Sequence, residues 1–253
     1  MNESEGSALG TATLAVVIPT LNEADLLPKL LRRLFVDGAD LVVVADGGSD
    51  DRSVELAKAA GALTVMSARG RGQQLRAGAM AALQEGAELL WFVHADNLPL
   101  EGSLRALRSA AASSDGTDQA WACRQRVDAS GRFYRLVERK AGRRVASGLV
   151  YGDSGLFVTA ATYEKAGGFR SIPLFEDLDL SRRLAALGPV SIVDEAQILV
   201  NARRWQGEGA LRTTIRNWIL TMAWNLGVAP ERLVRFYPVH SRRSVKSQPT
   251  ESK

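Results

Sequence analysis

Cysteine and histidine are nearly absent from this sequence of 253 residues. Cys123 is the single cysteine, which excludes an internal disulfide and a zinc site built from cysteines, and favours a reducing compartment. We therefore expect a cytoplasmic protein. His94 and His240 are the two histidines, so we expect that carboxylates carry out most of the proton transfer at any active site.

Long hydrophobic runs are also missing. No stretch approaches the roughly eighteen uninterrupted apolar residues of a membrane-spanning helix, and residues 1–12 lack the basic start and apolar run of a secretory signal. We expect a soluble or peripherally attached protein. Residues 1–12 and 239–253 show no periodicity, which predicts a flexible tail at the first end, a flexible basic tail at the second, and one domain over residues 13–238.

A strong charge of either sign is lacking as well. The 32 basic and 28 acidic residues are spread along the chain and give a net charge of +4, so we expect no nucleic-acid partner. The hydrophobic share of 46% and the charged share of 24% are close to those of soluble globular proteins. This composition predicts a folded core.

The N-terminal part of the sequence alternates the patterns of buried strands and of amphipathic helices. The predicted strands lie at residues 14–18, 41–45, 63–66 and 89–93, and the predicted helices at 26–34, 53–60 and 73–85. Asn22 is expected to cap the first of these helices. The alternation predicts an α/β fold with a doubly wound, mostly parallel sheet and helices on both faces.

The second half of the sequence changes character. Residues 119–126 and the glycine-rich residues 148–158 predict a small antiparallel portion of the sheet, and residues 133–144 predict a basic helix. Further helices are expected at 178–187 and 210–226. One side of the last helix carries apolar residues that we expect in the core, with peripheral membrane contact the less favoured interpretation: Leu211, Ile215, Trp218, Ile219, Met222 and Leu226.

Polar residues directly follow three of the predicted strands. Pro19 to Glu23 follows the first, Asp46 the second, and His94 and Asp96 the fourth. Sheets of this kind bind ligands at the carboxyl ends of their strands. Gathering acidic groups at one edge brings little benefit to a purely structural protein, so the pattern favours a binding site.

Asp46 ends a predicted strand and precedes Gly47 and Gly48, which allow a tight turn. Its carboxylate is placed to accept hydrogen bonds from a nucleoside. The alternative is an ordinary Asp-Gly turn, and the motif by itself favours that alternative because such turns are common.

His94 and Asp96 lie two residues apart at a strand end, so both side chains can face one crevice. Imidazole and carboxylate together can bind Mn²⁺ or Mg²⁺ beside phosphate oxygens. The alternative is a histidine that caps a strand end, and the adjoining acid makes the two interpretations about equally favoured.

Two basic segments are suited to phosphate. Arg71 lies in the glycine-rich residues 69–73, just before a predicted helix N-terminus. No Gly-Lys-Ser/Thr follows, which excludes a Walker A loop. Arg203, Arg204 and Trp205 can pair with a diphosphate and stack on a ring, or form a solvated basic loop.

Glu176 and Asp177 open a predicted amphipathic helix. Acids in a first helical turn are favoured by the helix dipole alone, which is the structural alternative. Because histidine is scarce, we expect a carboxylate to be the base for an acceptor hydroxyl, with Asp177 the first candidate and Glu176 or Asp153 in reserve. The helix dipole is expected to keep Asp177 ionised at neutral pH.

These motifs together resemble family 2 glycosyltransferases, most closely the small bacterial subgroup labelled selenium- or radical-SAM-domain-associated transferases. The resemblance extends from about Leu14 to Tyr237. It rests on short elements that occur in the family's order, at residues 17–23, 45–50, 70–78, 94–96, 152–155, 176–177 and 204–205.

The resemblance implies a GT-A-type fold and transfer of a sugar, with inversion, from a nucleotide-diphosphate sugar to an acceptor that the sequence does not identify. It implies a divalent cation, Mn²⁺ or Mg²⁺, held by Asp96, with His94 standing where the family has the first acid of Asp-x-Asp. Asp177 is implied to be the base. The donor side then comprises Pro19, Glu23, Asp46, Gly48, Arg71, Asp96, Arg204 and Trp205, and the acceptor side Gly152, Asp153 and Ser154.

Two other functions compete with sugar transfer. A nucleotidyltransferase of related fold would favour a glycine-rich basic signature in the first loop, which Pro19 to Glu23 does not provide. A catalytically silent module that binds a nucleotide sugar has no need of Asp46, Asp96 and Asp177 together.

Overall fold

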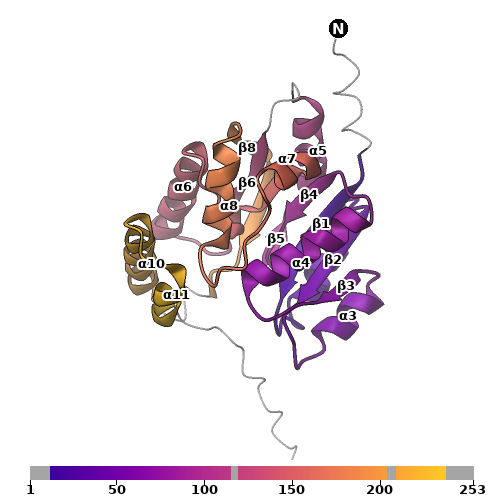
Figure 1. Cartoon of the computed structure of the whole chain (residues 1–253), viewed down its shortest axis with the longest axis horizontal. Helices are drawn as coiled ribbons and strands as arrows, with labels where there is room; N and C mark the ends of the chain where they lie inside the picture. The colour runs from indigo at the N-terminus through magenta and orange to yellow at the C-terminus, as the bar shows by residue number, and fades with distance from the viewer. Residues whose placement is uncertain (1–11, 115–118, 204, 206–208, 238–253) are drawn as a thin grey trace, which may run out of the picture.

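The computed structural model describes residues 12–114, 119–203, 205 and 209–237. Within these residues, eight strands form one sheet in the order β3-β2-β1-β4-β7-β6-β8-β5 (Figure 1). The strands are β1 Leu14–Thr20, β2 Leu41–Asp46, β3 Leu63–Met66, β4 Leu89–Phe92, β5 Asn97–Pro99, β6 Ala120–Val127, β7 Leu156–Thr159 and β8 Val190–Val200.

Helices cover both faces of the sheet, which confirms the predicted α/β fold. The helices are α2 Leu27–Val36, α3 Ser53–Ala59, α4 Arg71–Gln84, α5 Ser103–Ala112, α6 Arg132–Ala146, α7 Ala160–Lys165, α8 Glu176–Ala185, α10 Ala210–Asn225 and α11 Pro230–Leu233, with 3₁₀ turns η1 Gly152–Ser154 and η2 Val234–Phe236. No helix in the described part of the chain is long and apolar enough to cross a membrane.

The strands β1, β2, β3 and β4 are parallel, as the βα alternation predicts. Side chains of β1 alternate between the two cores, because successive residues of a strand point to opposite faces. Leu14 and Val16 pack with α2 and α5, whereas Val17 packs with α4. A Cβ atom at Gly78 of α4 would lie 2.5 Å from Cγ1 of Val17, so only glycine permits this close approach of helix and strand.

The second half supplies the antiparallel part of the sheet. β7 pairs antiparallel with β4 and β6, and β5 pairs antiparallel with β8, while β6 and β8 are parallel. The sequence analysis did not predict β5, α5, α7, β8 or α11. β5 has three residues, α11 has four and α7 has six, too few for a periodic pattern to show.

Asn22 does not cap α2, in contrast to the prediction. The residue before α2 is Leu26, and a proline occupies the first turn, where it needs no amide partner. Asn22 instead adopts a left-handed conformation with φ of 54°, and its Oδ1 accepts a hydrogen bond from the backbone N–H of Asp50 at 2.9 Å. The side chain therefore ties the loop after β1 to the loop after β2.

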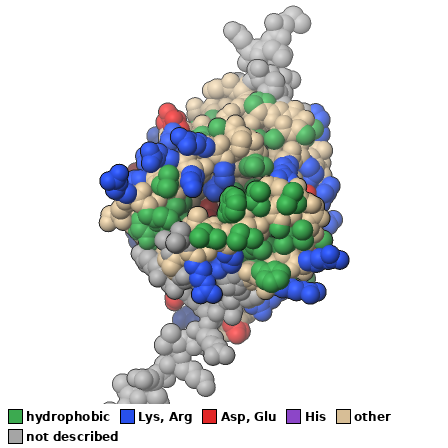
Figure 2. All heavy atoms as spheres, turned by 90° about the vertical axis from the view of Figure 1, so that its left-hand side faces the viewer, with side chains coloured by type: hydrophobic (Ala, Val, Ile, Leu, Met, Phe, Trp, Pro, Cys, Tyr) green, Lys and Arg blue, Asp and Glu red, His purple; other side chains and the backbone are tan. Residues whose placement is uncertain are grey.

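The prediction that one side of α10 forms core is wrong. Figure 2 shows the side of the molecule that carries α10, where hydrophobic side chains gather at the surface. Leu220 and Trp224, on the opposite side of the helix, pack with α8 and α11, and Trp224 stacks on Phe175 at 5.2 Å. Five of the residues predicted to lie in the core are exposed, with exposed fractions from 42% for Met222 to 81% for Leu226: Ile215, Trp218, Ile219, Met222 and Leu226. The side chain of the sixth, Leu211, is not among those that the structure describes.

Candidate active site

A pocket lies where the carboxyl end of β4 meets η1, α8 and α10. It brings together Arg71, His94, Asp153 and Asp177, which the sequence singled out from four separate segments. The remaining lining residues are Tyr151, Gly152, Leu174, Phe175, Asn217, Leu220, Thr221 and Tyr237. The pocket thus contains carboxylates, a guanidinium and an imidazole beside apolar walls, a mixture typical of sites that hold a polar ligand.

Asp177 is oriented by hydrogen bonds on both carboxylate oxygens. Oδ2 accepts the backbone N–H of Gly152 at 2.7 Å, and Oδ1 accepts that of Leu178 at 2.8 Å. Burial raises the pKa of Asp177, and the charge of Glu176 raises it further, against the opposing effects of Arg71, the Gly152 amide and His94. The helix dipole favours the ionised form of Asp177, but burial beside a second acid has the larger effect on this pKa.

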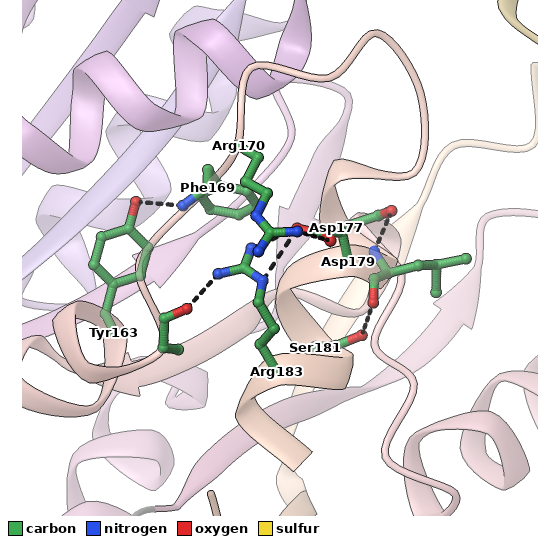
Figure 3. Close-up of polar contacts among 9 residues, drawn as sticks. Tyr163, Phe169, Arg170, Asp177, Asp179, Ser181 and Arg183 are labelled. Carbon is green, nitrogen blue, oxygen red and sulfur yellow. Dashed lines mark hydrogen bonds and ion pairs between the residues drawn. The ribbon is translucent and has the colours of Figure 1, made fainter. Parts of the chain in front are cut away.

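The three acids in the first turn of α8 have different partners. Glu176 is 1% exposed and pairs with Arg71. Asp179 turns away from the pocket and pairs with Arg183 at 2.5 Å and with Arg170 at 3.2 Å (Figure 3). Asp177 is therefore the acid of this turn that faces the pocket, while its neighbours anchor the helix start.

Glu176 and Arg71 form a largely buried ion pair between the starts of α8 and α4. Burial lowers the pKa of Arg71, but the charges of Glu176 and Asp177 raise it by more, so the guanidinium stays charged. The chain permits this approach because a Cβ atom at Gly72 would lie 2.6 Å from the carbonyl oxygen of Arg170. Glu176 thus holds the charged guanidinium of Arg71 in place near Asp177.

His94 lies on the Asp177 side of the site. Its Nδ1 is 3.4 Å from Oδ1 of Asp153, and a Cβ atom at Gly152 would lie 2.2 Å from its Nε2. His94 thus packs directly on the backbone that donates to Asp177. Its predicted place at a metal stays a prediction, and the structure puts it in a different pocket from Asp96.

Asp96 and Glu23 share one cation, Arg203. Nη2 of Arg203 lies 3.0 Å from Oδ2 of Asp96 and 3.1 Å from Oε1 of Glu23. Burial lowers the pKa of Arg203, whereas Asp96 and Glu23 raise it, and the increase is the larger effect. Asn201 holds this turn of the chain, since its Oδ1 accepts the backbone N–H of Arg203 at 2.9 Å.

This arrangement is compatible with a divalent cation that takes most of its ligands from a substrate. Within the described residues, no group of three or more His, Cys, Asp or Glu side chains forms a ready-made metal cage. Mg²⁺ is usually held by one or two carboxylates together with phosphate oxygens and water. Asp96 and Glu23 match that need, because they already converge on a positive group.

Asp46 is fully buried and organises its own loop. Oδ2 accepts the backbone N–H groups of Gly48 and Ser49, each at 2.8 Å, and Oδ1 accepts the hydroxyl of Ser49. Ser49 Oγ in turn accepts the N–H of Asn22. Asp46 therefore makes the hydrogen bonds of an Asp-Gly turn, and its contact with a nucleoside stays a prediction. Gly48 has φ of 88°, a conformation that glycine adopts without strain.

The remaining predicted residues lie around this centre. Pro19 is in β1 opposite Ala45 of β2. Ser154 is 1% exposed and does not line the Asp177 pocket. Trp205 contacts Tyr134 edge to face, with ring centroids 6.3 Å apart. Arg204 lies outside the described residues.

Sequence reasoning missed the wall of the pocket that α10 provides. The hydroxyls of Tyr151 and Thr221 are 3.2 Å apart, and Asn217 Oδ1 is buried with no hydrogen-bond partner among the described residues. Arg144 of α6 stacks over the ring of Tyr151 at 4.1 Å. A search for polar residues on the side of α10 opposite its apolar stripe would have found Asn217 and Thr221.

Solved structures of similar fold include complexes of an enzyme from Mycobacterium tuberculosis. Glucosyl-3-phosphoglycerate synthase in complex with Mn²⁺, UDP and glucosyl-3-phosphoglycerate is 20% identical, with a TM-score of 0.60, over 88% of this chain and 83% of the other. The same enzyme with Mg²⁺ and UDP is 19% identical, with a TM-score of 0.55, over 77% and 72% of the two chains. These similarities confirm the predicted GT-A-type fold.

Comparison with curated proteins gave no match. The model of a protein family, glycosyl transferase family 2, matches residues 15–169, which is more than half of the chain. That stretch contains β1 from its second residue onwards, β2 to β4, Glu23, Asp96 and the Gly152 segment. The chain therefore belongs to glycosyl transferase family 2.

Proposed function

We propose that this protein transfers a sugar, with inversion, from a nucleoside-diphosphate sugar to an acceptor hydroxyl, with Asp177 as the base. The observation that carries the proposal is the placement of Asp177 in the pocket. Its carboxylate is held by the Gly152 amide, lies beside the charged Arg71, and has a raised pKa. A carboxylate with a raised pKa is a better proton acceptor than an ordinary aspartate.

The donor would bind at the ends of β1 and β4, with its diphosphate near Glu23, Asp96 and Arg203. Arg203 pairs with Asp96, and Arg71 lines the Asp177 pocket; both guanidiniums can pair with phosphate oxygens. A divalent cation bound by Asp96 would neutralise the developing charge of the diphosphate leaving group. Solved relatives of the same fold contain Mn²⁺ or Mg²⁺ with UDP, which supports this assignment.

The acceptor hydroxyl would enter beside Tyr151, Asn217 and Thr221. Asp177 would take its proton as the oxygen attacks the anomeric carbon, and the carbon's bond to the diphosphate would break on the opposite side. His94 and Asp153 would keep the Gly152 segment in place, because His94 packs on Gly152 and lies 3.4 Å from Asp153. The proton ends on Asp177 and is released to water after the product leaves.

Donor hydrolysis tests this proposal without knowledge of the acceptor. UDP-, GDP- and dTDP-sugars are incubated with the protein, with and without Mn²⁺, and release of the nucleoside diphosphate is measured. We expect slow hydrolysis of at least one donor that depends on the cation, as water replaces the acceptor. Binding of a donor without hydrolysis would favour a silent module, and binding of no donor would contradict the proposal. Formation of a nucleotide sugar from a sugar phosphate and a nucleoside triphosphate would favour a nucleotidyltransferase.

A further inference from the structure

An exposed apolar band runs along α10 and continues onto η2. We call it the α10 surface and define it by Ile215, Trp218, Ile219, Met222, Leu226 and Phe236. The spacing of three and four residues puts its α10 members on one side of the helix. Trp218 is 64% exposed and Phe236 69% exposed. Between α10 and α11 the chain leaves an apolar groove of about 550 Å³.

The α10 surface is bordered by basic residues. Arg212 on α10, Arg232 on α11 and Arg235 on η2 are exposed. Glu231 on α11 is exposed as well, but α10 contains no Asp or Glu, so these three elements carry more basic than acidic side chains. α6 lies on the same side of the molecule and exposes a basic stripe, Arg132, Arg135, Arg139, Lys140 and Arg143. Figure 2 shows hydrophobic side chains gathered on this side with Lys and Arg around them and few acids.

We propose that the α10 surface docks the protein onto membranes that contain anionic lipid. Helices that lie in a membrane interface combine Trp, Phe and Leu on one side with Lys and Arg at its border. The arginines would meet lipid phosphates and carboxylates, while Trp218, Ile219 and Phe236 would enter the boundary between headgroups and acyl chains.

Charge decides between a membrane and a second copy of this chain. A twofold dimer through the α10 surface would bring the same arginines of both copies together, and like charges across an interface disfavour association. An anionic lipid surface instead offers charges of the opposite sign over the whole width of the patch. An acidic polypeptide would pair with the arginines but would leave the apolar side chains between them exposed to water, whereas a lipid surface would cover both.

Docking would place a membrane next to the proposed acceptor site. The opposite side of α10 contributes Asn217, Leu220 and Thr221 to the Asp177 pocket. The two sides of a helix with its side chains are only about 10 Å apart. We therefore infer that the acceptor hydroxyl belongs to an amphipathic molecule held in the membrane, an inference that rests on the proposed sugar transfer.

Cosedimentation with vesicles tests the docking surface independently of catalysis. The full chain is mixed with vesicles of equal parts phosphatidylcholine and phosphatidylserine, or of phosphatidylcholine alone, at low and high salt. We expect binding to the anionic vesicles that weakens with salt. The double variant Trp218→Ser/Ile219→Ser should bind at least about tenfold more weakly, because it removes two large apolar side chains from the contact.

Matched control variants distinguish a specific effect of the α10 surface from a general effect of losing any exposed apolar side chain or arginine. Val36→Ser removes an apolar side chain that is 74% exposed on α2, away from the α10 surface, and should bind like the wild type. Arg212→Gln/Arg235→Gln should weaken binding and reduce its salt dependence, whereas Arg105→Gln on α5 should not. These arginine variants test the surface even if the double serine variant does not fold.

Three results would overturn the proposal. The first is no binding to anionic vesicles at low salt by the wild type. The second is equal binding by the wild type and both α10-surface variants, or equal binding to polyglutamate and to vesicles. The third is a wild-type dimer in sedimentation equilibrium that Trp218→Ser/Ile219→Ser converts to monomer, without vesicle binding. None of these measurements uses a donor or an acceptor, so their results do not depend on whether the protein catalyses the proposed sugar transfer.

Discussion

Arg203 and Asp96 form an ion pair with 3.0 Å between Nη2 and Oδ2, although they are 107 residues apart in the chain. The same nitrogen contacts Glu23, so one guanidinium joins the ends of β1 and β4 to the segment after β8. This positive group lies where we propose that a diphosphate and its cation bind. The ion pair therefore predicts competition between Arg203 and a divalent cation for Asp96.

Arg203→Gln should raise the affinity for Mn²⁺ in the absence of nucleotide. We expect a rise of about two- to fivefold, because a partly exposed ion pair contributes up to about 1 kcal/mol. Titration of Mn²⁺ followed by electron paramagnetic resonance measures it. Arg52→Gln is the control, since Arg52 pairs with Glu55 on the surface of α3. Unchanged or weaker Mn²⁺ binding by Arg203→Gln would remove Asp96 as the cation's ligand.

Gly152→Ala should impair turnover more than stability. The added methyl group would overlap His94 and displace either the imidazole or the amide that holds Asp177, so we expect kcat to fall by about tenfold or more, as for a misplaced catalytic group. Gly142→Ala in α6 is the matched control, because its Cβ would make an ordinary contact of 3.7 Å with Ile192 of β8. It should leave kcat unchanged. Equal kcat in both variants would show that the Gly152 segment does not position Asp177 for catalysis.

Asp46→Ala should reduce stability and not only nucleotide affinity. The change leaves the buried amides of Gly48 and Ser49 without an acceptor, at a cost of about 1–3 kcal/mol in the free energy of unfolding. UDP affinity should fall in parallel as the loop loses its shape. Urea unfolding and calorimetry measure the two effects. A variant of wild-type stability with lost affinity would instead show that Asp46 contacts the nucleoside, as the resemblance to family 2 glycosyltransferases implies.

The acid side of the pH profile reports the state of Asp177. A base must be deprotonated, so activity should fall as the pH drops through the raised pKa of Asp177, above the value of about 4 for an ordinary aspartate. Glu176→Gln removes a neighbouring negative charge that raises this pKa. The acid limb of kcat/KM should then move to lower pH. If the acid limb of kcat/KM stays in place or moves to higher pH in Glu176→Gln, the titrating group is not Asp177.

The periodic parts of the chain could be predicted from the sequence, and the partners of polar residues could not. Helical spacing of apolar residues predicts α2 correctly, and the residues that show this spacing are all buried: Leu30, Leu31 and Leu34. The stripe on α10 has the same spacing, yet Ile215 and Ile219 are exposed. Hydrophobic periodicity shows that a helix has two sides, but it does not show which side the rest of the fold covers.

The site shows the same limit. Placing Asp96 and Asp177 at the edge of the sheet needs only strand ends and a helix start. The partners of these acids, Arg203 and Gly152, are far from them in sequence. The pairing of β5 with β8 brings Arg203 to Asp96, and the placement of η1 against the start of α8 brings Gly152 to Asp177. Sequence spacing likewise suggested that His94 and Asp96 face one crevice, but the two residues line different pockets. The alternation of a strand does not apply to them, because β4 ends at Phe92.

The role of Asp177 as the base is the central claim, and kcat of Asp177→Asn with a glycosyl acceptor tests it most directly. Asparagine keeps the shape but removes the basic oxygen, so kcat should fall by about 10² to 10⁴ while UDP affinity stays at the wild-type value. Asp179→Asn is the control from the same helical turn, and it should lower the melting temperature through loss of the Arg183 pair while kcat is retained. Near wild-type turnover by folded Asp177→Asn would contradict the account and transfer the role to Asp153 or His94 in the same pocket.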